Sequence, residues 1–395
     1  MKKLMILGAS KLQVPAIKKA KEMGIYTIVL DMNPEAVGFQ FADTFEVIST
    51  LDTESVLECA RNYKIDGILT IASDRPMKTV ALVAEVLKLS SISKDAALKA
   101  TNKYEMREAL KTNGVPIPLY LKFDKVEKCI TALKDLKYPL ILKPEDNSGS
   151  RGISLVEKFD PDTIADAFLY AKKNSQSGGV LIEEYMIGPE VSVESITIDN
   201  KTFVLAITDK ITTGAPHFVE LGHSQPSFLD QSIQEEIIDI TNRTIHAIGI
   251  TNGPAHTEII ITESGPKVVE IGARMGGDNI TSHLVPISTG IDMTKAVIEL
   301  ALGIHPNIRR TFSKGSSIRY FNFDPGKIKN IYNSIENSDK KNLVEYCLDL
   351  SVGQTIKTIE NSSERYGYVI CSGESSVQAL ENASDFLTLV EIEYF

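Results

Sequence analysis

The first 95 residues alternate short apolar runs with segments of helical spacing, and this alternation restricts the fold more than any other feature. Apolar runs at 4–7, 26–30 and 68–71 have the length of strands, and apolar residues recur at helical spacing over 14–23. Strands separated by helices pair in parallel through helical crossovers. We therefore predict a parallel α/β unit at the start of the chain.

The rest of the chain mixes helical segments with alternating segments. A helical stretch over 93–113 is closed by Gly114, Pro116 and Pro118, which marks a domain boundary. Further on, alternation predicts two antiparallel hairpins, and helical spacing predicts three helices, with the hairpins at 190–208 and 257–271 and the helices at 231–248, 293–302 and 376–383. The expected fold class is α/β followed by α+β.

Composition and charge argue against several classes of function. The 395 residues are 43% hydrophobic and 24% charged, and their formal net charge of -10 argues against a nucleic-acid partner. No apolar run reaches about 18 residues, so no membrane span is expected. The four cysteines are scattered without a CxxC pair, which argues against a disulfide framework or a zinc site. We expect a protein of the reducing cytoplasm.

Two lysines and a small-residue loop are candidates for phosphate binding. Lys103 follows Thr101-Asn102, and Lys143 ends an apolar strand, where its ammonium group would emerge at a sheet edge. The loop 146–152 has small side chains whose backbone N–H groups could close over phosphate oxygens, namely Ser148, Gly149, Ser150 and Gly152. It is not a P-loop because the GKS/T ending is absent. A solvated lysine and a plain turn are the alternatives.

Acidic residues in apolar surroundings are the second kind of candidate. The segment 181–190 runs from an apolar strand into Glu183, Tyr185, Met186 and Glu190, which could offer backbone groups to an adenine edge and a carboxylate to ribose hydroxyls. Glu258 and Glu270 both interrupt apolar strand patterns. If the chain turns at Ser264-Gly265, the two carboxylates lie side by side and need a cation such as Mg²⁺ between them.

The ordered set of lysine, lysine, glycine-containing loop, Glu183-Glu184-Tyr185-Met186 hinge and paired glutamates resembles the ATP-grasp superfamily. The resemblance covers most of the chain. It implies a Rossmann-like pre-ATP-grasp domain over 1–95, an ATP-grasp domain of two α+β lobes over 96–314 with a lid lobe at about 120–185, and a small C-terminal α+β lobe over 315–395 similar to those of biotin carboxylase-like and purine-biosynthesis members.

By the same resemblance, each candidate acquires a role with ATP and Mg²⁺ or Mn²⁺. Lys103 and Lys143 would bind phosphates, 146–152 would form the lid, and Glu258 and Glu270 would hold the metal. Adenine would contact Glu183 and the backbone of Tyr185 and Met186, and Glu190 the ribose. Arg274 would stabilise the transferring phosphoryl group.

The form EIGARMGGD, at 270–278, and the segment 216–226 look most like the amino-acid ligase branch. This similarity adds Glu220, His223 and Gly276 to Arg274 as candidate substrate contacts. One position departs from the family pattern, because Gly272 stands where many ATP-grasp enzymes have Asn, and a third metal-side ligand is missing there.

The expected activity is that of an ADP-forming carboxylate–amine ligase acting through an acyl phosphate on small molecules, with a homodimer as the expected assembly. Alternatives within the class are a phosphoribosylglycinamide synthetase-like ligase and a bicarbonate-dependent carboxylase-type enzyme. A non-catalytic ATP-binding protein is a further alternative. An NAD-dependent oxidoreductase is disfavoured, because Gly8-Ala9-Ser10 with Asp31 lacks the full GxGxxG and has Leu12 and Gln13 where glycines are needed.

Overall fold

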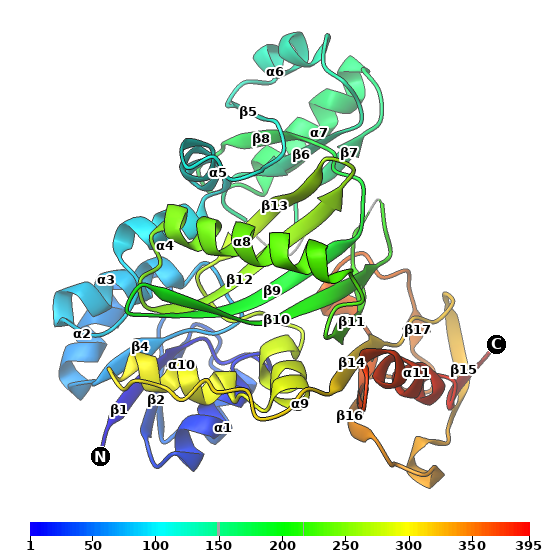
Figure 1. Cartoon of the computed structure of the whole chain (residues 1–395). Coiled ribbons are helices and arrows are strands. Elements are labelled where there is room, and N and C mark those ends of the chain that lie inside the picture. Colours follow the sequence, from blue (N-terminus) through cyan, green and yellow to red (C-terminus); the bar gives the residue numbers. More distant parts are fainter. Residues whose placement is uncertain (148–150, 216) are drawn as a thin grey trace.

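The computed structural model describes residues 1–147, 151–215 and 217–395. Its first unit contains a parallel sheet in the order β3-β2-β1-β4, with helices at its faces (Figure 1). The predicted alternation of strands and helices is confirmed. The strands are β1 (Lys3–Leu7), β2 (Tyr26–Asp31), β3 (Thr44–Val47) and β4 (Gly67–Leu69), and the helices α1 (Val14–Glu22), α2 (Thr53–Tyr63) and α3 (Met77–Leu87).

The predicted single helix over 93–113 is two helices, α4 (Lys94–Thr101) and α5 (Lys103–Thr112). Asn102 ends the first in an extended conformation, and its side chain accepts from the amides of Tyr104 and Glu105 to begin the second. This break places Lys103 at the N-terminus of α5, turned toward the interior.

A small lobe follows, drawn at the top of Figure 1. Its antiparallel sheet, in the order β5-β8-β6-β7, is covered by two helices around a separate apolar core that includes Leu142, Phe168 and Ile182. The elements are β5 (Tyr120–Phe123), α6 (Val126–Leu133), β6 (Leu140–Pro144), β7 (Ser154–Val156), α7 (Pro161–Lys173) and β8 (Val180–Glu184).

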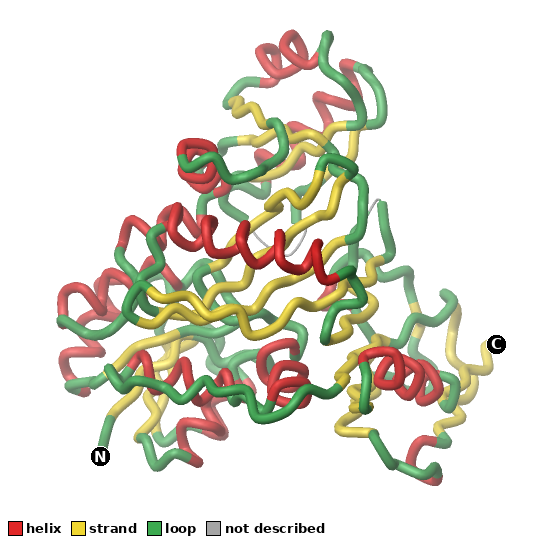
Figure 2. The backbone as a smooth tube through the Cα atoms, viewed as in Figure 1, coloured by secondary structure: helices red, strands yellow, loops and turns green. Residues whose placement is uncertain are grey.

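An eight-stranded antiparallel sheet forms the centre of the molecule, with α8 (Gln231–Ile248) lying across it (Figures 1 and 2). Both predicted hairpins are confirmed. The strands, in spatial order, are β13 (Gly265–Gly272), β12 (Gly253–Thr262), β9 (Glu190–Ile198), β10 (Lys201–Thr212), β11 (Glu220–Gln225), β14 (Gly315–Tyr320), β18 (Gly367–Gly373) and β16 (Leu343–Leu348).

Three of these strands come from the last 81 residues, so the central sheet continues across residue 315 through the pairing of β11 with β14. The same C-terminal part adds a three-stranded sheet and one long helix, α11 (Ser376–Leu387), as the sequence predicted. The sheet consists of β17 (Thr355–Ile356), β15 (Gly326–Asn333) and β19 (Val390–Tyr394).

The N-terminal unit and the central sheet share their hydrophobic cores. Met5 and Ile28 of the first sheet belong to the same buried cluster as Val193 and Ile271 of the central sheet. A second cluster joins the first sheet to α9 (Val285–Thr289) and α10 (Met293–Ala301). This shared packing fixes the parallel sheet against the central sheet.

Candidate functional site

A cavity of about 380 Å³ lies where the N-terminal unit, the small lobe, the central sheet and the C-terminal part meet. This volume is within the usual range for small-molecule sites. Most of the residues predicted from the sequence line it, namely Lys103, Lys143, Glu183, Tyr185, Met186, Glu190, Glu220, His223, Glu258, Glu270 and Arg274. Of the other predicted residues, Ser148, Gly149 and Ser150 lie outside the described residues.

Glu258 and Glu270 are direct cross-strand partners in the β12–β13 hairpin, as the sequence predicted. Each carboxylate is held by cationic side chains. Glu270 accepts from the Lys103 ammonium group at 3.0 Å, and Glu258 lies 3.2 Å from Lys210 Nζ and 3.4 Å from His256 Nε2. The pair has the oxygen ligands and the charge that Mg²⁺ prefers, so these residues fit the metal. Within the described ranges no group of three or more His, Cys, Asp or Glu side chains could hold an ion.

Lys210, on β10, was not singled out from the sequence. Its ammonium group lies 2.5 Å from Glu190, 3.2 Å from Glu258 and 3.9 Å from Glu220, and its side chain is only 5% exposed. Burial alone would lower the pKa of Lys210, but the three carboxylates hold it well above its ordinary value. The sequence offered only a charged residue three positions after the apolar run 203–207.

Lys143 is placed by a buried ion-pair network. Its ammonium group lies 2.6 Å from Glu183, whose carboxylate also accepts from Arg107 Nε at 2.8 Å and Nη2 at 3.1 Å. The Glu183 carboxylate, predicted to contact adenine, is thus occupied by two cations. We revise its role to orienting Lys143. Burial, together with the charge of Arg107, lowers the pKa of Lys143.

The hinge after β8 brings backbone to the cavity. The Tyr185 amide donates to the Pro139 carbonyl at 3.3 Å, while Met186 lies in the cavity wall. Gly188 has φ +152°, and a Cβ there would come 1.9 Å from the Ile261 carbonyl oxygen. The hinge therefore passes too close to β12 for any side chain at this position.

The substrate-side candidates are joined by residues that the sequence did not reveal. His223 Nε2 lies 3.3 Å from Asp278, and Asp278 binds the Arg365 guanidinium group at 2.6 and 2.8 Å. Burial would raise the pKa of Asp278, but Arg365 and His223 hold it far below its usual range. No local pattern in the sequence marks Arg365, which reaches Asp278 in the cavity wall from the C-terminal part.

Gly276, another predicted substrate contact, is not among the described lining residues. Its amide donates to Glu194 Oε2 at 3.2 Å. The other oxygen of Glu194, which is fully buried, lies 2.5 Å from His256 Nδ1. Burial lowers the pKa of His256, but Glu194 outweighs this and raises it to about 9. Gly276 thus supports the carboxylate that holds His256. Gly152, at the end of the predicted lid, packs against Asn174 and Pro144.

The first βα turn of the N-terminal unit is closed by its own side chains. Asp31 accepts from the amides of Ala9 at 2.8 Å and Asn33 at 2.9 Å, and Gln13 accepts from the Ser10 amide at 3.1 Å. The acidic residue that would bind a ribose in a dinucleotide site is therefore engaged locally.

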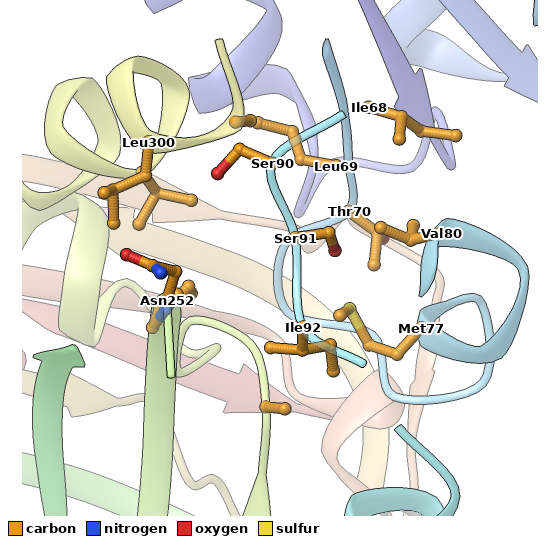
Figure 3. Close-up of a pocket in the computed structure, with 15 residues that line it drawn as sticks. Ile68, Leu69, Thr70, Met77, Val80, Ser90, Ser91, Ile92, Asn252 and Leu300 are labelled. Atoms are coloured by element: carbon orange, nitrogen blue, oxygen red, sulfur yellow. The ribbon is translucent and has the colours of Figure 1, made fainter. Parts of the chain in front are cut away.

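A smaller hollow between the N-terminal unit and α10 is shown in Figure 3. It measures about 40 Å³ and is lined mainly by apolar side chains such as Ile68, Met77, Ile92 and Leu300. Its volume suits one or two water molecules rather than a substrate. In the part of the chain that the structure describes, no helix is long and apolar enough to cross a membrane.

This cavity, with lysines from two elements facing paired glutamates, matches what comparisons with known proteins find. The sequence matches the ATP-grasp domain over residues 136–282 and the L-amino acid ligase C-terminal domain 2 over residues 319–394. Residues 136–282 thus form an ATP-grasp domain, and residues 319–394 are similar to the C-terminal domain of L-amino acid ligases.

Three similar proteins illustrate this placement. Alanine–anticapsin ligase of Bacillus subtilis is 27% identical over 270 residues, which are 62% of this chain and 56% of that protein. The L-amino acid ligase of Bacillus licheniformis has a TM-score of 0.84 at 22% identity, covering 100% of this chain and 99% of that one. Phosphoribosylglycinamide synthetase of Anaerococcus prevotii has a TM-score of 0.80 at 24% identity over the full length of both chains. At these identities the two solved structures establish the fold.

The Glu183 network makes acid stability a test of the site. Burial would raise the pKa of Glu183, but Arg107 and Lys143 lower it from 4.5 to about 2. A carboxyl group with a lowered folded-state pKa stabilises the protein above its unfolded-state pKa and loses that contribution as pH falls through the folded value. We expect about 3 kcal/mol of stability to disappear between pH 4.5 and 2.

Urea unfolding over this pH range, compared between wild type and Glu183→Gln, measures the effect. The variant should be less stable at pH 7 and flatter in its acid dependence. Glu263→Gln, which changes an exposed glutamate on the β12–β13 turn, should keep the wild-type profile. An acid profile of Glu183→Gln as steep as that of wild type would contradict the assignment.

Proposed function

We propose that this chain is an ADP-forming ligase that joins a small-molecule carboxylate, of the amino-acid class, to an amine through an acyl phosphate. The observation that carries the proposal is the cross-strand pair Glu258–Glu270 facing Lys103 and Lys143 in one cavity. Two carboxylates that can share a divalent cation, opposite two ammonium groups, suit a triphosphate. The match to the L-amino acid ligase C-terminal domain 2 supports an amino-acid substrate.

In this proposal a carboxylate oxygen attacks the γ-phosphorus of ATP, and the bond to the ADP oxygen breaks. The amine nitrogen then attacks the acyl carbon, inorganic phosphate leaves, and the nitrogen gives up a proton. Bound Mg²⁺ or Mn²⁺ would supply charge neutralisation for the triphosphate, held by Glu258 and Glu270.

The chain's own groups place the reactants. Lys103 would exchange Glu270 for phosphate oxygens, and Lys143 would reach the phosphates while Glu183 keeps it oriented. Glu190 and the backbone beside Met186 would bind the nucleoside. Arg274 would stabilise the charge of the phosphoryl group and the acyl phosphate. Glu220 and His223 would contact the substrate beside Asp278. The small lobe with the loop 146–152 would exclude water and protect the acyl phosphate from hydrolysis.

The direct test is a screen of amino acids with Mg-ATP for stimulated phosphate release, with mass spectrometry of the products. We expect release that depends on both a carboxylate and an amine, with a dipeptide-like product. Phosphate release only with phosphoribosylamine and glycine would favour the phosphoribosylglycinamide synthetase-like alternative. We retain this alternative because the fold is similar to that of such an enzyme. ATP binding without release under any condition would indicate a non-catalytic nucleotide-binding protein.

We also propose that the chain has three units, at 1–95, 96–314 and 315–395. We propose a cytoplasmic location and a homodimer as its assembly. Light scattering of the purified chain checks the assembly, and it would contradict the homodimer if the mass stayed at that of the 43.4 kDa chain.

A further inference from the structure

The loop after β4 carries an acidic residue from the N-terminal unit into the cavity. Asp74 lines the cavity two residues after Ala72, whose φ of 55° is in the left-handed region that alanine seldom adopts. Gln13 holds this loop, because its side-chain amide donates to the Ile71 carbonyl at 2.8 Å and to Ser73 Oγ at 3.2 Å. The buried Gln13 therefore fixes the loop in an unfavourable backbone conformation.

Asp74 forms a two-point ion pair with Arg274. Arg274 Nε donates to Asp74 Oδ1 at 2.7 Å and Nη2 to Oδ2 at 3.0 Å, and the two side chains are 14% and 12% exposed. Such a forked pair restricts the direction of the guanidinium plane more than one hydrogen bond does. Arg274 Nη1 donates to the Met275 carbonyl at 3.2 Å. Three of its donor contacts are thus fixed by the protein.

Gly272 leaves the space that this pair occupies. A Cβ at position 272 would lie 2.6 Å from Asp74 Oδ1 and 3.1 Å from Arg274 Nε. The backbone there is outside the left-handed region, so its conformation does not require glycine. The requirement is space. In a side-chain amide the oxygen lies roughly 2.4 Å from Cβ by ordinary bond lengths. Asp74 Oδ1 therefore lies at about the distance from this Cβ at which an asparagine would carry its side-chain oxygen.

We infer that Asp74 is a positioning residue for the reaction, supplied by the N-terminal unit, and that it orients Arg274 in the space left free by Gly272. The inference rests on the proposed function for its catalytic consequence, but the pairing itself does not. Gln13 holds the loop at Ile71 and Ser73, and Asp74 on the same loop holds Arg274. Gln13, which stands where a dinucleotide-binding site would have a glycine, thereby holds the loop that carries Asp74.

Two variants test the pair from opposite sides. Asp74→Asn removes the charge at nearly constant shape, and Gly272→Asn places a side chain where the Asp74 carboxylate lies. In both, Arg274 should react several-fold faster with phenylglyoxal, as followed by mass mapping of its peptide. In both variants, kcat/KM for the carboxylate substrate should fall about tenfold to a hundredfold, because Arg274 loses the Asp74 carboxylate that orients it. The Kd for ATP should stay within about twofold, because Lys103 and Lys143 are untouched.

Asp66→Asn is the matched control, since Asp66 pairs with Lys2 at 3.0 Å in the same unit away from the cavity. It should change none of the three quantities. Unchanged Arg274 reactivity in both Asp74→Asn and Gly272→Asn would overturn the inference, even if no carboxylate supports phosphate release. Equal losses in ATP affinity and carboxylate use would also overturn it, because they would show general damage to the fold.

Discussion

Replacing Glu270 by Gln should lower Mg-ATP-dependent phosphate release on the order of a thousandfold. The substitution keeps the shape of the side chain but removes one of the two charges that face each other across β12 and β13. It also leaves the Lys103 ammonium group, 3.0 Å away, without its carboxylate partner. Steady-state phosphate release measures the turnover, and titration with Mn²⁺ followed by electron paramagnetic resonance measures the metal directly.

Glu263→Gln provides the control in the same hairpin, because Glu263 is an exposed residue at the turn. It should keep both turnover and Mn²⁺ affinity. Wild-type turnover in Glu270→Gln would show that the metal assignment is wrong. Weaker Mn²⁺ binding in that variant, measured with nucleotide present, would support the assignment independently of the substrate.

Replacing Lys210 by Met should destabilise the protein by about 3 kcal/mol, because it leaves partly buried carboxylates without their shared, buried cation. Glu190 and Glu258 lie 2.5 and 3.2 Å from the ammonium group. Burial, and to a smaller extent the neighbouring Glu258, raise the pKa of Glu190 even with Lys210 in place. Millimolar Mg²⁺ should restore part of the lost stability in the variant, since a divalent cation can replace the missing charge.

Thermal and urea unfolding with and without Mg²⁺ measure this effect. Lys201→Met, at the exposed start of the same strand, should change the free energy of unfolding by less than about 0.5 kcal/mol, with no added response to Mg²⁺. Stability of Lys210→Met equal to that of wild type, or the same Mg²⁺ response in both proteins, would show that Lys210 is not the cation that balances this cluster.

The cavity's two kinds of ion pair have different consequences for the proposed reaction. The Lys103–Glu270 pair is 9% and 23% exposed and can open to admit a phosphate and a metal. The Arg107–Glu183 pair is 0% and 4% exposed and remains a fixed support for Lys143. An ion pair that can be exchanged serves binding, whereas one without access to solvent serves positioning.

Secondary-structure elements that depend on a local periodicity could be predicted from the sequence. The strand–helix alternation at the start, the helix over 231–248 and the two hairpins are confirmed because each depends on periodicity within about twenty residues. The pairing of Glu258 with Glu270 was predicted from a tight turn between their strands. The strands turn at Glu263 and Ser264, and a register shift between Glu258 and Ile259 brings the two glutamates opposite each other.

Other parts of the site have no local signal. Arg274 is joined to Asp74 across 200 residues of sequence, and Asp278 to Arg365 across 87. Nothing in the neighbourhood of Asp74 or Arg365 identifies its partner, because the contact exists only after the N-terminal unit and the C-terminal part pack on the central sheet. The position of Asp74, just beyond the end of a parallel strand, was the one clue available.

The sequence by itself predicted most of the secondary-structure elements, the resemblance to ATP-grasp proteins and eleven of the residues that line the cavity. Only the tertiary structure decided which charged groups pair. It pairs Glu183 with Arg107 and Lys143, and Lys210 with three glutamates. It also explains Gly272 by the space that Asp74 and Arg274 occupy. The physical reason is that residue type and periodicity are properties of a segment. The partner of a buried charge is a property of the packing that excludes water from both groups.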